Sequence, residues 1–578
     1  MTSNPDVDLD NKELQQALQL IQFTRRSLFL TGKAGTGKST FLRYICSVTK
    51  KKYVVLAPTG IAAINAGGST LHSFFKIPFH PLLPNDSQYS ARHIKDTLKY
   101  NSAQRKVLRE VELIIIDEIS MVRADIIDFI DKVLRIYSRN MREPFGGKQL
   151  LLVGDIYQLE PVVKEDDRKL LRPFYPSCFF FDAHVFREMQ LVSIELKKVY
   201  RQTNPVFIKI LDRIRTNTTQ ADDINELNGR VGTELKTKDN NLAITLATRR
   251  DTVDYINEKQ LEELPGDTST FTGEIKGEFP ENSLPTPMEL QIKVGAQIIF
   301  IKNDIDKRWV NGTLGVIEAI DEEEGIIYVI TEDGNEYEVQ RESWRNLRYT
   351  FNEVEKKIEE EELGVYIQYP IRLAWAITVH KSQGLTFRQV KIDFTGGVFA
   401  GGQAYVALSR CTSLEGISLK EPIRRDEIFV RNEIINFARH YNDNRLINKA
   451  MNESKADKEY YDAAKAFDDG NMDSFIDNFF KAIHSRYDIE KPASKRLIRM
   501  KLNTINSLKE EKRQLIEEKK KQEQFLKKLA AEYTLLGKEC EKEHMDEAAM
   551  SNYKKALELY PEAKDAQRRL DKLSKPKK

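Results

Sequence analysis

The stretch SLFLTGKAGTGKSTFLRYI, residues 27–45, constrains the fold of this chain more than any other. An apolar run leads into a glycine-rich turn and then into an amphipathic pattern, which predicts a strand, a loop and a helix in succession. Gly32, Gly35 and Gly37 allow backbone N–H groups to face inward, and the start of the helix adds the positive end of its dipole. The spacing GxxxxGKS is therefore typical of a phosphate-binding loop. An ordinary glycine-rich loop is the alternative, but the flanking strand and helix disfavour it.

The side chains of this loop predict what it binds. Lys38 can reach the β- and γ-phosphates of a nucleotide, and the Ser39 hydroxyl can ligate Mg²⁺. We therefore expect ATP and Mg²⁺ as cofactors. The residues expected to bind the nucleotide in this segment are Gly32, Ala34, Gly35, Thr36, Gly37, Lys38, Ser39 and Thr40.

Two carboxylates follow the apolar run ELIIIDEIS, residues 112–120. A continuous apolar run bounded by charge is typical of a buried parallel strand, and ligands bind at the carboxyl ends of such strands. We expect Asp117 to hold Mg²⁺, either through water or together with Ser39, and Glu118 to orient and deprotonate the attacking water. The alternative is an exposed strand end without a catalytic role.

A third expected strand, QLLLVGD (149–155), is followed after a short turn by Gln158. A glutamine at this position, four residues beyond Gly154, is placed to touch a γ-phosphate or its water, and hydrolysis would break that hydrogen bond. This position would sense whether the third phosphate is present. The alternative is a plain turn residue.

Composition describes a soluble globular protein. The 578 residues predict roughly three to five domains. The 90 basic residues nearly cancel the 88 acidic ones, so the net charge neither indicates nor excludes a nucleic-acid partner. The four cysteines are scattered without a CxxC pair, which indicates reduced thiols and neither a disulfide framework nor a zinc site.

The polar, acidic start MTSNPDVDLDNKE is not typical of a signal or transit peptide. No apolar run reaches the roughly 18 residues of a membrane span. We expect a soluble, cytoplasmic protein without a membrane partner.

Eight segments, taken in order, resemble the motif series of one helicase family. They are GKAGTGKS, APTGIAA (57–63), TLHSFF (70–75), IIIDEISM (114–121), EPFGGKQLLLVGDIYQLEPV (143–162), VYRQ (199–202), AITVHKSQGLTF (376–387) and GQAYVALSR (402–410). Together they are similar to the PIF-type (petite integration frequency) DNA helicases, in the 5′→3′ branch of superfamily 1. The PFGGKQL stretch is the more family-specific part, and the others are shared with RecD-like enzymes. One departure is Glu160 in QLEPV, where the family usually has QLPPV; Gln158 is retained.

The resemblance covers about residues 12–440 and implies further nucleotide-site residues. It assigns Arg201 and Arg410 as arginines that a second lobe supplies to the γ-phosphate, a contribution worth ~10³–10⁵ in rate. For any single arginine, the alternative is a solvated surface charge. We also count Gln15, Gln383 and Gly384 among the nucleotide-binding residues.

A strand of DNA is expected to run across both lobes. APTGIAA and LAITLATRRD (242–251) each end a strand with groups that suit phosphate contacts, and the apolar run of AITVHKSQG (376–384) ends in polar side chains between the DNA and the nucleotide. Phe74 and Phe75 are more typical of the core. The expected DNA-binding residues are Thr59, Gly60, His72, Thr248, Arg249, His380 and Lys381.

The predicted fold is α/β, with two RecA-like P-loop NTPase lobes, a small β-barrel-like insert in the second lobe and an all-helical C-terminal region. The expected ranges are 1–195 for the first lobe, 77–95 for an excursion that forms either a strand-separating wedge or a proline-rich loop, 196–300 and 366–440 for the second lobe, 301–365 for the insert, and 441–578 for the helices. Within the insert, an EDGNE turn indicates a hairpin, and the acidic run EVEKKIEEEEL (353–363) suggests a solvated loop.

The C-terminal region carries the spacing of one tetratricopeptide unit, a helical hairpin of about 34 residues. Its apolar positions between 493 and 530 are too sparse for a sustained coiled coil, and 464–483 resembles a degenerate second copy. A protein partner can dock on such helices; a plain helical hairpin is the alternative. The matching positions are Tyr533, Leu536, Gly537, Cys540, Ala549, Tyr553, Ala556 and Pro561.

The resemblance implies an ATP- and Mg²⁺-dependent DNA helicase that moves 5′→3′ on single strands. It would act as a monomer on single-stranded DNA and on duplex junctions, including forks, recombination intermediates and G-quadruplexes, in DNA repair, recombination and telomere maintenance. The alternatives are a RecD-like subunit, an RNA-directed motor, or a nucleotide-gated scaffold that works through its helical tail.

Overall fold

The computed structural model describes residue 8 and residues 10–235, 242–355, 357–485 and 492–574. The first seven residues, which carry part of the acidic start, lie outside the described residues. The chain divides into two compact units, Met1–Lys465 and Ala466–Lys578. Within the described ranges, no helix combines the length and the apolar character needed to cross a membrane.

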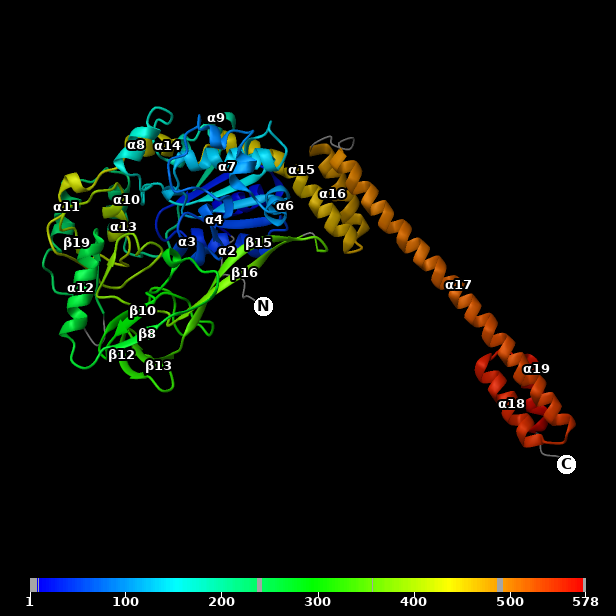
Figure 1. Ribbon diagram of the computed structural model, residues 1–578. Helices are drawn as coiled ribbons and strands as arrows, with labels where there is room; N and C mark the ends of the chain where they lie inside the picture. Colours follow the sequence, from blue (N-terminus) through cyan, green and yellow to red (C-terminus); the bar gives the residue numbers. More distant parts are fainter. Residues whose placement is uncertain (1–7, 9, 236–241, 356, 486–491, 575–578) are drawn as a thin grey trace. The chain divides into compact units, whose positions relative to one another are not determined.

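A parallel six-stranded sheet carries the glycine-rich loop (Figure 1). Its central strands are buried on both faces, as their continuous apolar runs predict. The strands β4, β5 and β1 are parallel neighbours. The glycine-rich loop, the two carboxylates and the Gln158 turn therefore all follow the carboxyl ends of these strands, on the same side of the sheet. The strand order is β3 (Ser69–Thr70), β2 (Tyr53–Ala57), β4 (Leu113–Ile116), β5 (Gln149–Val153), β1 (Leu28–Gly32) and β6 (Val192–Leu196).

Helices cover this first sheet. One of them is α7 (Ala124–Tyr137), whose apolar residues recur at helical spacing and are buried in the core. Phe75 is fully buried, which confirms its expected place in the core, and Phe74 packs partly buried against it. The other helices of this part are α1 (Lys12–Phe23), α2 (Lys38–Val48), α3 (Gly60–Ala66), α4 (Leu71–Phe75), α5 (Ile94–Leu98), α6 (Ser102–Glu110), α8 (Glu165–Leu171) and α9 (Val185–Glu188).

A second parallel sheet has four strands in the order β18 (Ala376–Thr378), β7 (Ile244–Ala247), β19 (Val390–Asp393) and β20 (Ile417–Leu419). The strand expected at the start of AITVHKSQG is therefore present and pairs with β7. The helices that accompany this sheet are α10 (Pro205–Arg215), α11 (Ala221–Asn228), α12 (Arg250–Glu263) and α13 (Gln403–Leu408).

Antiparallel strands lie between the two halves of the second sheet. The hairpin expected at the EDGNE turn is confirmed, because β13 pairs with β14. The sequence places residues 291–300 in the second lobe, but β11 pairs with β12 and β17, so it extends the antiparallel part. The five-stranded sheet contains β14 (Glu336–Val339), β13 (Ile326–Thr331), β12 (Leu314–Asp321), β11 (Gln297–Phe300) and β17 (Ile371–Leu373), and smaller sheets pair β8 (Ser269–Thr272) with β10 (Glu289–Ile292), and β9 (Glu274–Gly277) with β16 (Lys357–Gln368) and β15 (Glu342–Asn352).

The expected solvated loop at the acidic run is wrong, because most of the run lies in strand β16, which pairs with β15. Two carboxylates of the run have partners on β15: Glu361 pairs with Arg348 at 2.9 Å, and Glu359 accepts from the Asn352 side chain at 3.0 Å. The hairpin also reaches the first sheet. The Tyr349 hydroxyl accepts a hydrogen bond from the Val55 N–H at 3.1 Å and donates to the Val55 carbonyl at 3.2 Å. It thereby satisfies an edge of β2 next to the two residues that pair with β3.

The chain returns to the first sheet after β20. Ile434 of α14 (Asn432–Ala438) is buried in the core of the first lobe, and Phe437 packs against it. Ile447 and Ala450, at the start of α15 (Asn444–Asp468), join the core on the other face of the same sheet. This is why the first compact unit extends to Lys465, beyond the boundary expected at 440.

The second compact unit is helical, as expected. Helix α17 (Pro492–Lys542) ends against α18 (Asp546–Leu559), which is followed by α19 (Lys564–Leu573), and α16 (Met472–Ser485) precedes them. Tyr553 is buried in the helical pair, and a Cβ on Gly537 would lie 2.5 Å from its ring. The helical hairpin expected from the spacing is therefore present.

Candidate functional site

The glycine-rich loop after β1 has the shape of an anion cradle. Gly35 and Gly37 have φ angles of 79° and 82°, which side-chain-bearing residues rarely adopt. A Cβ on Gly35 would lie 2.5 Å from the Cβ of Arg201, so another segment closes over the loop. The Lys38 ammonium donates to the carbonyls of Gly32 at 2.6 Å and Lys33 at 2.9 Å. A cation held across a ring of inward-turned backbone fits a polyphosphate.

The two predicted carboxylates stand at the end of β4, beside this loop. Asp117 accepts a hydrogen bond from the Glu118 N–H at 2.9 Å, and Glu118 has a φ of 49°. Burial and the neighbouring Asp117 charge raise the pKa of Glu118 to about 7, although Lys38 and Arg410 oppose the shift. A carboxyl group with this pKa is suited to accept a proton near neutral pH.

The Gln158 turn meets the end of AITVHKSQG. The Gln383 side-chain amide donates to the Gln158 side-chain oxygen at 3.4 Å. A Cβ on Gly402, at the start of α13, would lie 2.0 Å from the Gln158 carbonyl oxygen. The turn after the first sheet therefore touches two segments of the second lobe, and the approach at Gly402 leaves no room for a side chain.

Both predicted arginines lie in this contact zone. Arg410 is 1% exposed, so it is not a solvated surface charge. Its guanidinium donates to the carbonyl groups of Val406, Ser382 and Leu385. Burial and the nearby Arg201 lower the pKa of Arg410 to about 9, and Glu118 opposes this shift. The second lobe thus holds a buried cation by backbone carbonyls, near the carboxylates of the first.

Arg201 donates to the Ser409 carbonyl at 3.2 Å and to the Gly384 carbonyl at 3.4 Å. Burial lowers its pKa. The last residues of AITVHKSQG therefore contact the Gln158 turn and both arginines.

Sequence reasoning missed a buried ion pair at the end of β5. Asp155 is fully buried and accepts a hydrogen bond from Arg215 of α10 at 3.0 Å. Arg215 also forms an ion pair with Glu195 at 3.0 Å, and its guanidinium lies 4.4 Å from the ring centroid of Tyr157. Asp155 had a signal, because it ends an apolar strand as Asp117 does. Arg215 had none, since it is one of two arginines in an ordinary amphipathic helix.

Two other contacts across the loop were also not predicted. Lys33 pairs with Asp212 of α10 at 2.5 Å, and the Ala34 N–H donates to the Tyr405 hydroxyl at 3.0 Å. Of the remaining predicted nucleotide residues, Ser39 is exposed on the first turn of α2 and Gln15 is exposed on α1.

The predicted DNA contacts of the first lobe lie at α3 and α4. The Thr59 hydroxyl caps α3 by accepting from the Ala62 N–H at 3.2 Å, and a Cβ on Gly60 would lie 2.9 Å from the Ser283 hydroxyl. His72 stacks on Phe79 with ring centroids 5.0 Å apart, and Phe79 is 82% exposed.

The predicted DNA contacts of the second lobe share one sheet edge, because β7 and β18 are paired parallel strands. Thr248 is buried and donates to the Gly397 carbonyl at 3.3 Å, whereas Arg249 and Lys381 are exposed. His380 stacks on Phe399 at 6.4 Å, and burial lowers its pKa.

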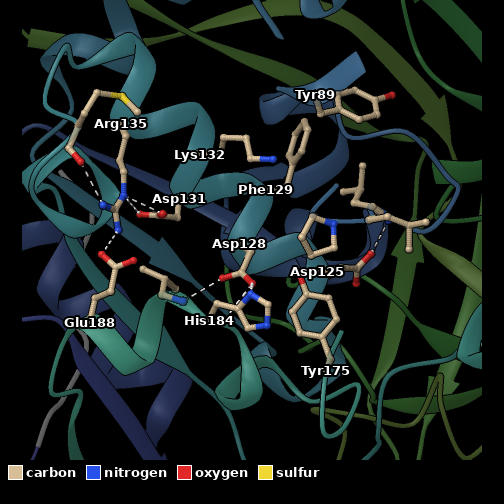
Figure 2. Close-up of a pocket in the computed structure, with 15 residues that line it drawn as sticks. Tyr89, Asp125, Asp128, Phe129, Asp131, Lys132, Arg135, Tyr175, His184 and Glu188 are labelled. Atoms are coloured by element: carbon tan, nitrogen blue, oxygen red, sulfur yellow. Dashed lines mark hydrogen bonds and ion pairs between the residues drawn. The ribbon is translucent and has the colours of Figure 1, made fainter. Parts of the chain in front are cut away.

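A cavity of about 290 Å³ lies between α7 and the excursion after α4 (Figure 2). Its acidic side chains are used within the protein. Asp125 accepts from the Leu82 N–H, Asp128 accepts from the N–H groups of His184 and Val185, and Asp131 pairs with Arg135. This network anchors the excursion and α9 to α7, whose sequence leads into the PFGGKQL stretch.

Comparison with known proteins identifies the family. Residues 10–224 match the family model described as PIF1-like helicase. A crystal structure of Bacteroides sp Pif1 in complex with ADP-AlF4 is 40% identical, with a TM-score of 0.68, and the match covers 75% of this chain and 97% of that one. The chain belongs to the PIF1-like helicase family.

Curated PIF1 relatives agree. The ATP-dependent DNA helicase PIF1 of Rattus norvegicus is 35% identical over 417 residues, and the human protein is 34% identical over 424. These matches cover 70% and 72% of this PIF1-like chain, but only 60% and 61% of the relatives' own length.

The unliganded Pif1 from Bacteroides sp has a TM-score of 0.67 with this PIF1-like chain, and the Bacteroides Pif1 bound to ssDNA has 0.55. Identity and coverage are the same in both matches, at 40%, 75% and 97%. The nucleotide-bound complex, at 0.68, and the unliganded protein thus match this chain more closely than the ssDNA complex does.

Proposed function

We propose that this chain is an ATP- and Mg²⁺-dependent DNA helicase. The observation that carries the proposal is the meeting of two lobes at one loop. The first lobe brings the cradle and Glu118, and the second brings the buried Arg410 and the end of AITVHKSQG. Nucleotide binding and hydrolysis can then change the contacts between the two lobes, which a motor requires. The curated relatives are named ATP-dependent DNA helicase.

In the proposed hydrolysis, the backbone of the glycine-rich loop and Lys38 hold the phosphates. Glu118 accepts the proton of the attacking water, for which its raised pKa suits it. Ser39 and Asp117 would hold Mg²⁺, which supplies charge neutralisation at the phosphates. Arg410 and Arg201 stabilise the charge that develops on the phosphoryl oxygens, and Gln158 orients the water.

The coupling to DNA runs through AITVHKSQG. His380 and Lys381 would hold strand phosphates, while Gln383, three residues from His380, contacts Gln158. Thr248 and Arg249 are proposed as further backbone contacts on the neighbouring strand end. In the first lobe, Thr59, Gly60 and His72 would bind the strand after the turn at Ser283 has moved away from Gly60.

The excursion 77–95 is proposed as the wedge that separates strands. Its exposed Phe79, stacked on His72, offers a ring to a base at the junction. Residues 269–373 are proposed to act as the barrel-like insert that retains the strand within two RecA-like lobes. The helical pair of α17 and α18 is proposed to dock a protein partner.

For direction and substrate we propose 5′→3′ movement by a monomer on single strands, forks and G-quadruplexes. The resemblance supports the direction. Forks are supported by a similar solved structure, 39% identical to this chain, which concerns DNA unwinding at forked dsDNA by two coordinating Pif1 helicases.

The deciding experiment measures the ATPase rate of the full chain with and without single-stranded DNA. We expect strong stimulation in the wild type and loss of hydrolysis in Lys38→Ala. A wild type that hydrolyses ATP at the same rate with and without single-stranded DNA would contradict the motor function and favour a nucleotide-gated scaffold. Duplexes with only a 5′ or only a 3′ tail then test direction, and preference for the 3′ tail contradicts it; tailed RNA duplexes test the choice of nucleic acid.

A further inference from the structure

We propose that Glu160 is a positioning residue that ties the Gln158 turn to the hinge between the second lobe and α14. This inference rests on the proposed function, because it concerns how the nucleotide site is coupled to lobe movement. Glu160 is also the residue at which this chain departs from the usual QLPPV pattern.

The geometry of Glu160 joins three segments. Its carboxylate accepts from the Arg431 guanidinium at 3.2 and 3.3 Å and from the Gly401 N–H at 3.4 Å. The Glu160 side chain is 12% exposed and that of Arg431 is 39% exposed. A charge-assisted pair in this partly buried setting is stronger than one at the open surface.

Each partner of Glu160 lies at a mechanical junction. Arg431 directly precedes α14, whose Ile434 is buried in the first lobe. Arg431 therefore lies at the point where the chain returns from the second lobe to the first. Gly401 and Gly402 precede α13, and the Gln158 carbonyl lies against Gly402. The other end of α13 leads to Arg410. Movement of the Gln158 turn is therefore transmitted to the hinge and to the helix before the arginine.

The chemistry of the departure supports this assignment. Proline at position 160 would fix φ and stiffen the turn from within. Glutamate gives no such stiffness, but its side chain reaches two other segments. In this chain the turn is thus held by external contacts in place of an internal ring.

The test uses a double-mutant cycle in the full chain. Glu160→Ala, Arg431→Ala and the double variant are compared for kcat and KM of ATP hydrolysis, with saturating single-stranded DNA and without DNA. We expect each single variant to lower the DNA-stimulated kcat about fivefold, with KM and unstimulated rate changed less than twofold. The double variant should lose no more than Glu160→Ala alone, because Glu160→Ala already removes the contact with Arg431 together with that to Gly401. Glu263→Ala, which removes an exposed ion pair within α12, is the control.

A charge exchange keeps the test independent of side-chain size. Arg431→Glu should lower the stimulated kcat further, and combining it with Glu160→Arg should restore at least half of the loss. Unchanged single variants, multiplicative loss in the double variant, or an equal loss of the unstimulated rate would each overturn the positioning role. These outcomes are read against a stimulated wild type; a wild type without stimulation overturns the proposed function itself.

Discussion

The two lobes contribute to the proposed nucleotide site in different ways. In the first lobe, short consecutive segments that end β1, β4 and β5 supply the cradle, the carboxylates and Gln158. In the second lobe, Arg410 is held by carbonyls from two separate segments, one of them the end of AITVHKSQG. The first share is a property of local sequence, and the second is a property of packing.

The two lobes also shift the pKa values of their charged groups in opposite directions. Burial raises the pKa of Glu118 and lowers that of Arg410, so each lobe holds a charge that is unfavourable when isolated from water. Each also favours the charged form of the other. Contact between the two groups therefore opposes the effect of burial on both.

The largest effect is expected for Arg410→Ala. Removing the cation that we propose faces the phosphoryl oxygens should lower the DNA-stimulated kcat by about 10³. ADP affinity, measured by titration calorimetry, should change little in comparison. Arg388→Ala, at an exposed arginine paired with Asp333, should leave kcat within about twofold. A loss at Arg410 below tenfold would mean that the second lobe gives structure without catalysis.

A smaller loss is expected for Glu118→Gln. The amide keeps the size of the side chain but accepts no proton, so kcat should fall by about 10² while nucleotide binding persists. Single-turnover hydrolysis with DNA present measures this step directly. Retention of most of the activity would show that the first lobe does not supply the base.

Lys381→Ala tests the DNA side of the second lobe. Losing one phosphate contact should lower the slope of log affinity against log salt by about 0.7 for single-stranded DNA. Fluorescence anisotropy at several salt concentrations measures this slope. Lys391→Ala removes an exposed lysine of β19 and should leave it unchanged. Equal slopes for the two variants would contradict the DNA contact.

The smallest effect concerns a second carboxyl group with a pKa of about 7. Burial and Asp333 raise the pKa of Glu332, which lies between β13 and β14, far in sequence from the glycine-rich loop. A carboxyl whose folded pKa is raised adds stability below its unfolded pKa of 4.5 and loses it as pH rises through about 7. The free energy of unfolding should therefore fall by about 1 kcal/mol between pH 5 and pH 8, allowing for partial exposure. Glu332→Gln should abolish this part of the pH dependence in urea titrations, and an unchanged profile would contradict it.

The local elements of the first lobe could be predicted because their chemistry lies within single segments. The loop at Lys38, the carboxylates at Asp117 and the strand before His380 all follow from apolar runs that end in polar residues. The helical tail and the EDGNE hairpin follow from periodicity and turn chemistry in the same way.

The rest depends on pairings between distant residues. The acidic run was interpreted as a loop because single-sequence polarity does not show that β16 pairs with β15 and that Arg348 neutralises Glu361. Arg215 could not be chosen from its neighbours until Asp155 was seen beside it. The boundary at 440 fell too early because residues of α15 pack on distant segments of the chain, as where the ring of Tyr461 lies 5.4 Å from that of Phe23.

Tyr349 and Ile434 have a consequence for how the protein is made. All six strands of the first sheet are synthesised before either residue. The packing of the first lobe is therefore incomplete until Tyr349 and Ile434 have been synthesised. Until they arrive, the Val55 edge of β2 offers free N–H and carbonyl groups to a neighbouring chain. Nascent chains should therefore depend on chaperones during this interval. A fragment that ends at residue 195 should aggregate under conditions in which the fragment 1–465 remains soluble.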